Sequence, residues 1–153
     1  MSEVPRLFVA VTDYDWFRLH ASKEHVDEVN FWRPSSSATF KALPRGGLFL
    51  FKLHSPRNFI VGGGFFAKFL QVPLTLAWES FGEANGARTI IEMRERISKY
   101  RHEPITQFDD PLIGCIILAE PFLPNRCERA DQAGIRKRPR LLPASRQVRC
   151  ESF

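Results

Sequence analysis

The 153-residue sequence lacks the features of several large classes of protein. No stretch approaches the roughly 18 consecutive apolar residues of a membrane-spanning helix. The amino-terminal apolar run is short, follows Glu3 and soon meets Asp13, which excludes a secretory signal and makes a cytoplasmic location the expectation. The three cysteines stand at long spacings without a CxxC pair, so neither a disulfide framework nor a cysteine zinc site is indicated.

Signatures of catalysis are also missing. The four histidines show no metal-ligand spacing, and no HExxH, GxSxG or Cys-His pattern occurs. The run Gly62-Gly63-Gly64 is not a phosphate loop, because neither GK[ST] nor GxGxxG follows it, and it predicts a bulge or a close backbone approach. We therefore assign no catalytic residue, metal ligand or cofactor to this chain.

The net charge of +5 does not extend over the whole chain. Residues 1–123 hold 14 Lys+Arg against 14 Asp+Glu, whereas residues 124–153 hold 8 against 3. The basic excess therefore says nothing about a folded part that ends near residue 123. The last 30 residues are rich in Arg and Pro without an apolar period, which predicts a disordered tail. Their abrupt change of composition also resembles translation out of frame.

The apolar pattern of residues 1–123 predicts one domain that contains both strands and helices. We expect strands at Leu7–Thr12, Val26–Trp32, Leu48–Leu53, Phe59–Phe69 and Leu112–Ala119. We expect helices at Asp15–Ala21, Pro73–Phe81 and Thr89–Tyr100, the first of them capped by Thr12 or Asp13. Because strands stand on both sides of the two later helices, the order favours an α+β fold, a small mixed β-barrel with flanking helices.

Two segments carry side chains that suit nucleic acid. The first, Asn30-Phe31-Trp32-Arg33-Pro34-Ser35, places two aromatic rings beside hydrogen-bonding groups, as a pocket for a flipped base requires. Alternatively, Phe31 and Trp32 are aromatic residues of the core and Arg33 is a surface residue. The second segment contains Lys52, His54, Ser55 and Arg57 around a predicted turn, where they could contact phosphates. His54 could equally be a structural histidine.

Five segments of the chain resemble known proteins. They are DYDWF (Asp13–Phe17), VNFWRPS (Val29–Ser35), LFLFKLHSPRNFIVGGGFF (Leu48–Phe66), AWESFGEANGA (Ala77–Ala87) and IGCIILAEPF (Ile113–Phe122). Together they are similar to the amino-terminal region of predicted restriction endonucleases of the HNH family. The longest of them also resembles the core hairpin of EVE and PUA-like domains.

The resemblance implies a fold and a role. It implies a PUA-like barrel that reads double-stranded DNA, with a modified cytosine flipped into an aromatic pocket. The residues that it favours for this contact are Asn30, Phe31, Trp32, Arg33, Ser35, Lys52, His54, Ser55 and Arg57, with Trp16 and Trp78 as further pocket walls. The HNH domain, whose divalent metal would cleave DNA, has no counterpart after Phe122, so we expect a specificity module without nuclease activity.

Two other functions stay open. Asp13, Asp15 and His54 could form the site of a small metal-dependent nuclease. Trp78 and Phe81 could instead face a protein partner from the second predicted helix. The sequence leaves the oligomeric state, the base that is read and the choice between DNA and RNA undecided.

Overall fold

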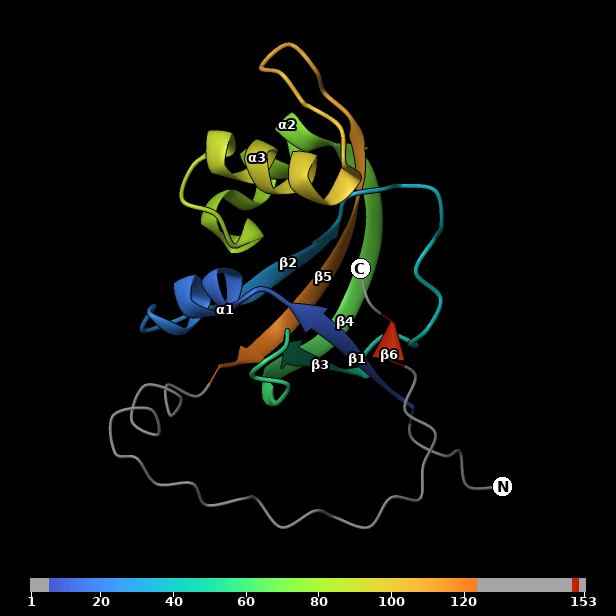
Figure 1. Cartoon of the computed structure of the whole chain (residues 1–153). Helices are drawn as coiled ribbons and strands as arrows, with labels where there is room; N and C mark the ends of the chain where they lie inside the picture. The colour runs from blue at the N-terminus through green and yellow to red at the C-terminus, as the bar shows by residue number, and fades with distance from the viewer. Residues whose placement is uncertain (1–5, 124–149, 152–153) are drawn as a thin grey trace.

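The computed structural model of the chain describes residues 6–123 and 150–151. In chain order its elements are β1 (Leu7–Thr12), α1 (Tyr14–Ala21), β2 (Glu28–Arg33), β3 (Leu48–Leu53), β4 (Ile60–Pro73), α2 (Leu74–Phe81), the short 3-10 helix η1 (Gly82–Asn85), α3 (Ile90–Arg101), β5 (Leu112–Phe122) and β6 (Cys150–Glu151) (Figure 1). Each predicted helix and strand has a counterpart whose ends lie within a few residues of the expected ones. The mixture of helices and strands confirms the α+β class.

All strands belong to one curved sheet with the order β2-β5-β4-β3-β1-β6. The pairs β2–β5, β4–β5 and β3–β4 are antiparallel, whereas β1 runs parallel to β3. The two residues of β6 pair only with Val9 and Ala10 of β1. In the described part of the chain β2 therefore remains an unpaired edge, and the prediction of a closed barrel is wrong.

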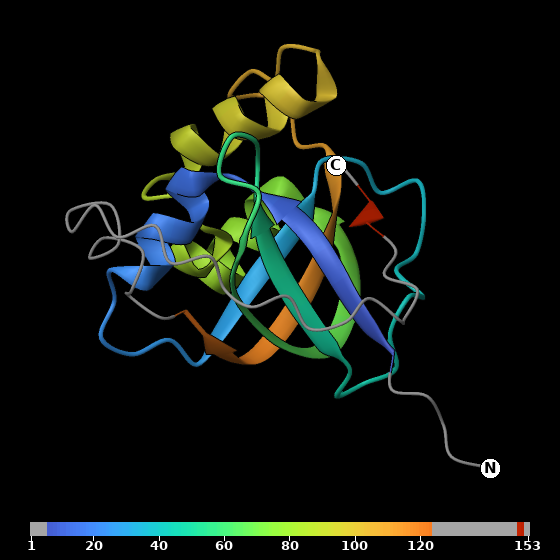
Figure 2. The same cartoon turned by 60° about the horizontal axis from the view of Figure 1, so that its bottom comes forward.

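The helix that follows β1 explains why the sheet stays open. A closed barrel would need hydrogen bonds between its first and last strands. Here the chain turns into α1 directly after β1, and the ring of Trp16 lies 5.5 Å from Phe31 of β2 and 5.0 Å from Phe51 of β3. The ring of Trp16 on α1 thus packs between β2 and β3. Figure 2 shows α1 lying alongside the curved sheet.

Strand β5 separates two hydrophobic cores. Ile116 and Leu118 face the first core, which β1, β3 and α1 complete with a cluster of phenylalanine rings. Ile113, Cys115 and Ile117 face the second core, formed with α2 and α3. A strand that is covered on both faces needs a continuous apolar run, and LIGCIILA is such a run. Cys115 is fully buried there.

The triple glycine lets β4 pass very close to its neighbours. A Cβ on Gly63 would lie 2.4 Å from the carbonyl oxygen of Phe49, and one on Gly62 would lie 2.2 Å from that of Phe122. The registers of β3 with β4 and of β4 with β5 both shift near this point. These observations confirm the predicted bulge and close backbone approach.

The tail that we expect to be disordered, residues 124–153, lies outside the described residues except for β6. Among the described helices none combines the length and the apolar character needed to cross a membrane.

Candidate functional site

A pocket lies at the gap between the edges of the sheet. Its lining comes from the end of β1, from α1, from β2 and from α3: Val11, Thr12, Asp13, Trp16, Phe31, Trp32, Pro34, Arg96 and Tyr100. Its cavity volume is about 40 Å³, and it is partly open to solvent. The open sheet is therefore what creates the pocket, since a closed barrel would pair the two edges.

Aromatic rings form most of the apolar surface of this pocket. Trp16 and Phe31 are buried, with 4% and 6% of their surface exposed, and belong to the first core. Trp32 and Tyr100 are half-buried, and their ring centroids lie 6.1 Å apart at an interplanar angle of 67°. A planar ligand could stack on one of these two rings and meet the other with its edge.

The carboxylate of Asp13 is the acidic group of the pocket. Asp13 stands at the N-cap position of α1, but its side chain makes no capping hydrogen bond, which corrects the predicted cap. Its Oδ2 instead accepts a hydrogen bond from the hydroxyl of Tyr100, and its Oδ1 lies 3.7 Å from Nε2 of His54. About a third of the Asp13 side chain is exposed, at 33%. The carboxylate is therefore held from α3 and the β3–β4 turn while it faces the pocket.

Tyr100 keeps its proton in this position. Burial raises the pKa of Tyr100 above its ordinary value, and the hydrogen bond to Asp13 and the negative charge of that carboxylate raise it further. The phenol is thus a hydrogen-bond donor to Asp13 at neutral pH. Arg96, on the same helix, donates to the carbonyl oxygen of Gly86 at 2.6 Å and to the carboxylate of Glu92.

The segment 82–86 holds Trp32 in place. The indole N–H of Trp32 donates to the carbonyl oxygen of Asn85 at 2.9 Å. The Asn85 side chain is buried, donates to the carbonyl oxygens of Ala77 and Gly82, and accepts from Asn30 at 2.8 Å. Asn30 therefore supports the pocket from the second core and does not face the pocket itself.

Replacement of Asn85 by alanine is expected to destabilise the fold by about 2 kcal/mol, because it leaves the buried amide of Asn30 without its partner. Urea denaturation measures this loss, and Glu79→Ala on the exposed face of α2 is the control that should change little. Equal stability of the Asn85 variant and the wild type would contradict this role of the network.

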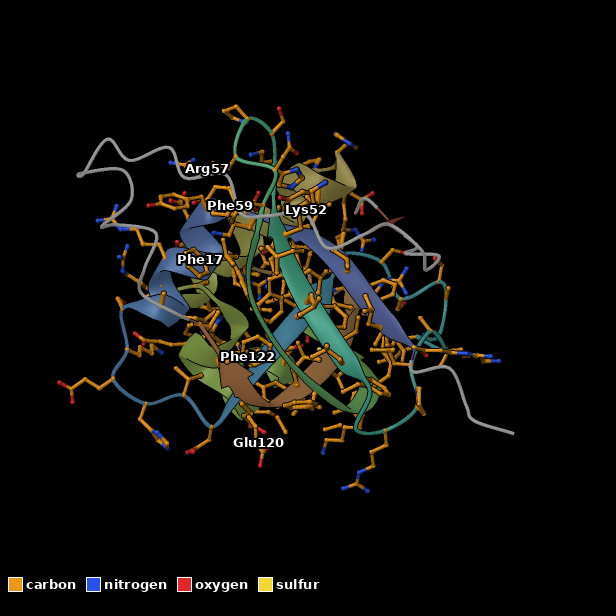
Figure 3. The ribbon with its side chains drawn as sticks, turned by 90° about the horizontal axis from the view of Figure 1, so that it is seen from below. Phe17, Lys52, Arg57, Phe59, Glu120 and Phe122 are labelled. Atoms are coloured by element: carbon orange, nitrogen blue, oxygen red, sulfur yellow. The ribbon has the colours of Figure 1, made fainter. Side chains whose placement is uncertain are left out.

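The β3–β4 turn places cationic side chains near the mouth of the pocket. The guanidinium of Arg57 lies 3.9 Å from the centre of the Tyr14 ring, so this turn packs onto the start of α1. Figure 3 shows Arg57 beside α1 and Lys52 on β3. His54 contributes its contact with Asp13, and Ser55 is exposed at the turn. Sequence reasoning named all four residues, and the structure places three of them on one turn.

The other predicted site residues lie apart from this group. Arg33 is half-buried at the end of β2, and Ser35 is exposed in the following loop, where its hydroxyl donates to Ser37. Trp78 lies on α2 and packs against the second core together with Phe81, outside the pocket lining. Both rings are half-buried, which weakens the hypothesis that they bind a protein partner.

Sequence reasoning missed the part that α3 plays in the pocket. Tyr100 and Arg96 both lie on α3 and line the pocket, and Arg96 also forms an i,i+4 ion pair with Glu92. No local signal connects Tyr100 with Asp13, because 87 residues separate them.

The structure brings together only two of the three residues that the nuclease alternative requires. Asp13 and His54 do lie together, but Asp15 is exposed on α1 and has no place in the pocket lining. Within residues 6–123 and 150–151, no three His, Cys, Asp or Glu side chains are grouped so that they could hold a metal ion.

Comparison with known proteins shows the fold. No family profile matches the chain, and no curated protein matches its sequence. The chain is similar in structure to ASCH from Zymomonas mobilis, with a TM-score of 0.51 at 10% identity, over 94% of this chain and 90% of that one. A tyrosine-to-phenylalanine variant of the same protein matches with the same TM-score and identity over 93% and 91%.

The chain thus has an ASCH-like fold. This likeness is one of fold alone. At 10% identity the likeness says nothing of activity, and no comparison supports an association with an HNH endonuclease.

Proposed function

We propose that this chain binds nucleic acid and holds one unpaired or flipped base in the pocket between Trp32, Tyr100 and Asp13. The observation that carries the proposal is the direction of the Asp13 carboxylate. It does not cap its own helix and is pinned by Tyr100 beside two aromatic rings. Stacking surface together with a polar group for the edge of the base is what a base pocket requires.

Two further features support a nucleic acid over a free small molecule. The β3–β4 turn brings Arg57 and His54 to the mouth of the pocket, where phosphates next to a bound base would lie. The ASCH-like fold belongs to a superfamily with RNA- and DNA-binding members. The finer role, reading a modified cytosine in duplex DNA for a restriction endonuclease, remains a prediction from the sequence resemblance.

The replacement Trp32→Ala is expected to weaken the binding of a fluorescent single-stranded oligonucleotide about tenfold, because stacking on an aromatic side chain contributes about 1–3 kcal/mol per base. Fluorescence anisotropy at fixed salt measures this change. Trp78→Ala is the matched control, since it removes a half-buried indole that packs on the second core outside the pocket.

Equal losses in the two tryptophan variants would contradict the pocket and indicate a general effect on the fold. Weak binding that no pocket variant changes, and that disappears with added salt, would show contacts with the basic tail alone. Oligonucleotides of DNA and RNA in single-stranded and duplex form decide which nucleic acid is preferred.

A further inference from the structure

The pocket contains an acidic side chain that accepts hydrogen bonds, Asp13, and a basic one that only donates them, Arg96. Asp13 offers only acceptors when ionised, and its two oxygens hold about four lone-pair positions. The hydroxyl of Tyr100 uses one of them at Oδ2, and His54 stands 3.7 Å from Oδ1. Acceptor positions therefore remain on both oxygens for donors of a ligand.

Arg96 supplies donors in the same pocket. Its guanidinium has five N–H groups, and the hydrogen bonds to Gly86 and Glu92 come from its two terminal nitrogens, one N–H from each. The side chain lines the pocket and is 17% exposed. Asp13 and Arg96 line the pocket together with Tyr100, so an acceptor and a donor group lie about the same ring.

The four bases fit this arrangement to different degrees. Guanine carries two neighbouring donors, its ring N1–H and its amino group, and an acceptor at O6 beside them. Cytosine and adenine each carry a single amino donor whose neighbouring ring nitrogen is an acceptor and repels a carboxylate. Thymine and uracil carry one N–H between two carbonyl oxygens. Only guanine presents two adjacent donors to a carboxylate.

Building on the proposed function, we infer that the base held in the pocket is guanine, which donates to Asp13 and accepts from Arg96 at O6. Asp13 is then the residue that determines specificity, and Trp32 and Tyr100 provide the surface that any base can use. This assignment differs from the modified cytosine that the sequence resemblance implies, so the two can be separated by experiment.

The test compares oligothymidylates that differ at one central position, which is guanine, hypoxanthine, cytosine, 5-methylcytosine, adenine or thymine. We expect the guanine oligonucleotide to bind about tenfold more tightly than the thymine one, because one well-formed pair of hydrogen bonds gives discrimination of that order. Hypoxanthine, which lacks the amino group of guanine, should fall between them.

The variant Asp13→Asn is expected to remove the preference for guanine, so that the guanine and all-thymine oligonucleotides bind this variant with similar affinity. In asparagine an NH₂ donor replaces one of the two carboxylate oxygens, so the two donors of guanine no longer face two acceptors. Asp15→Asn is the matched control, because it removes the same charge from an exposed position two residues along α1. It should keep the preference.

The outcomes separate this inference from the proposed function. Preference for cytosine or 5-methylcytosine, or equal binding of all six oligonucleotides with a loss in Trp32→Ala, would overturn guanine and leave base binding intact. Binding of none of them would overturn both. An unchanged preference for guanine in Asp13→Asn would overturn the role of Asp13.

Discussion

The variant Gly86→Ala is expected to lose on the order of 3–5 kcal/mol of folding free energy, the range in which a forced clash in a core is diagnostic. Gly86 has φ of +77°, and a Cβ there would lie 1.9 Å from Cδ1 and 2.3 Å from Nε1 of Trp16. The buried ring of Trp16 packs against Phe31 and Phe51 and cannot move aside. The loss follows because either the helix α1 or the segment 82–86 must shift.

Gly82→Ala provides a control with the same chemical change four residues earlier. Gly82 also has a positive φ, +48°, but nothing lies within 4 Å of the Cβ that the replacement would add. Only backbone strain remains there, about 1–3 kcal/mol, because Gly82 combines this φ with a ψ of −125°. Urea denaturation compares the two variants, and similar small losses in both would show that Gly86 does not pack beneath Trp16 as described.

Acidification from neutral pH to about pH 4 is expected to lower the free energy of unfolding by about 3 kcal/mol through His20 alone. Each unit of difference between the pKa values in the folded and unfolded states corresponds to about 1.36 kcal/mol. Burial, together with the positive charges of Lys23 and Arg96 and against the opposing charge of Glu83, lowers the pKa of His20 from 6.5 to about 4. Among the described residues neither ring nitrogen of His20 has a hydrogen-bond partner.

The sign follows from which state binds the proton more tightly. The unfolded chain protonates His20 near pH 6.5, whereas the folded chain resists until about pH 4. The folded state is therefore fully favoured above pH 6.5, and its stability falls as the pH drops from there to about 4. Below that pH the two states bind the proton alike, and this histidine adds no further loss.

His20→Phe keeps a ring of similar size against Trp16 and removes the titration. We expect the slope of unfolding free energy between pH 7 and pH 5 to be smaller in this variant than in the wild type. The carboxylates of Glu83 and Asp109, whose pKa values are lowered by hydrogen bonds, lose their contribution at lower pH. Equal slopes in both proteins would contradict a buried, neutral His20.

Much of the fold was predictable because its strands and helices carry local signals. The runs LFVAVT, LFLFKL and LIGCIILA all form strands, and the 3.6-residue pattern of α3 is correct to one residue at each end. The closure of the sheet was not predictable, since it depends on whether α1 packs between β1 and β2. No local pattern contains that information.

The candidate site was predictable on β2, at Trp16 and at the β3–β4 turn, but not on α3. Phe31 and Trp32 are neighbours on a strand, so their side chains point to opposite faces, and one of them was bound to enter a core. Both nevertheless line the pocket, because β2 is an edge strand and the pocket opens at that edge. Tyr100 and Arg96 come from a helix far along the chain, where their residue types indicate only amphipathic packing.

The central claim is that one base enters the pocket beside Trp32. The most direct measurement is a two-dimensional ¹H–¹⁵N NMR titration with a short single-stranded oligonucleotide that contains one guanine. We expect the largest shifts at the indole N–H of Trp32 and at the backbone amides of Asp13 and Tyr100, with the indole of Trp78 unchanged. Shifts confined to residues outside the pocket lining, or none at all, would contradict the claim.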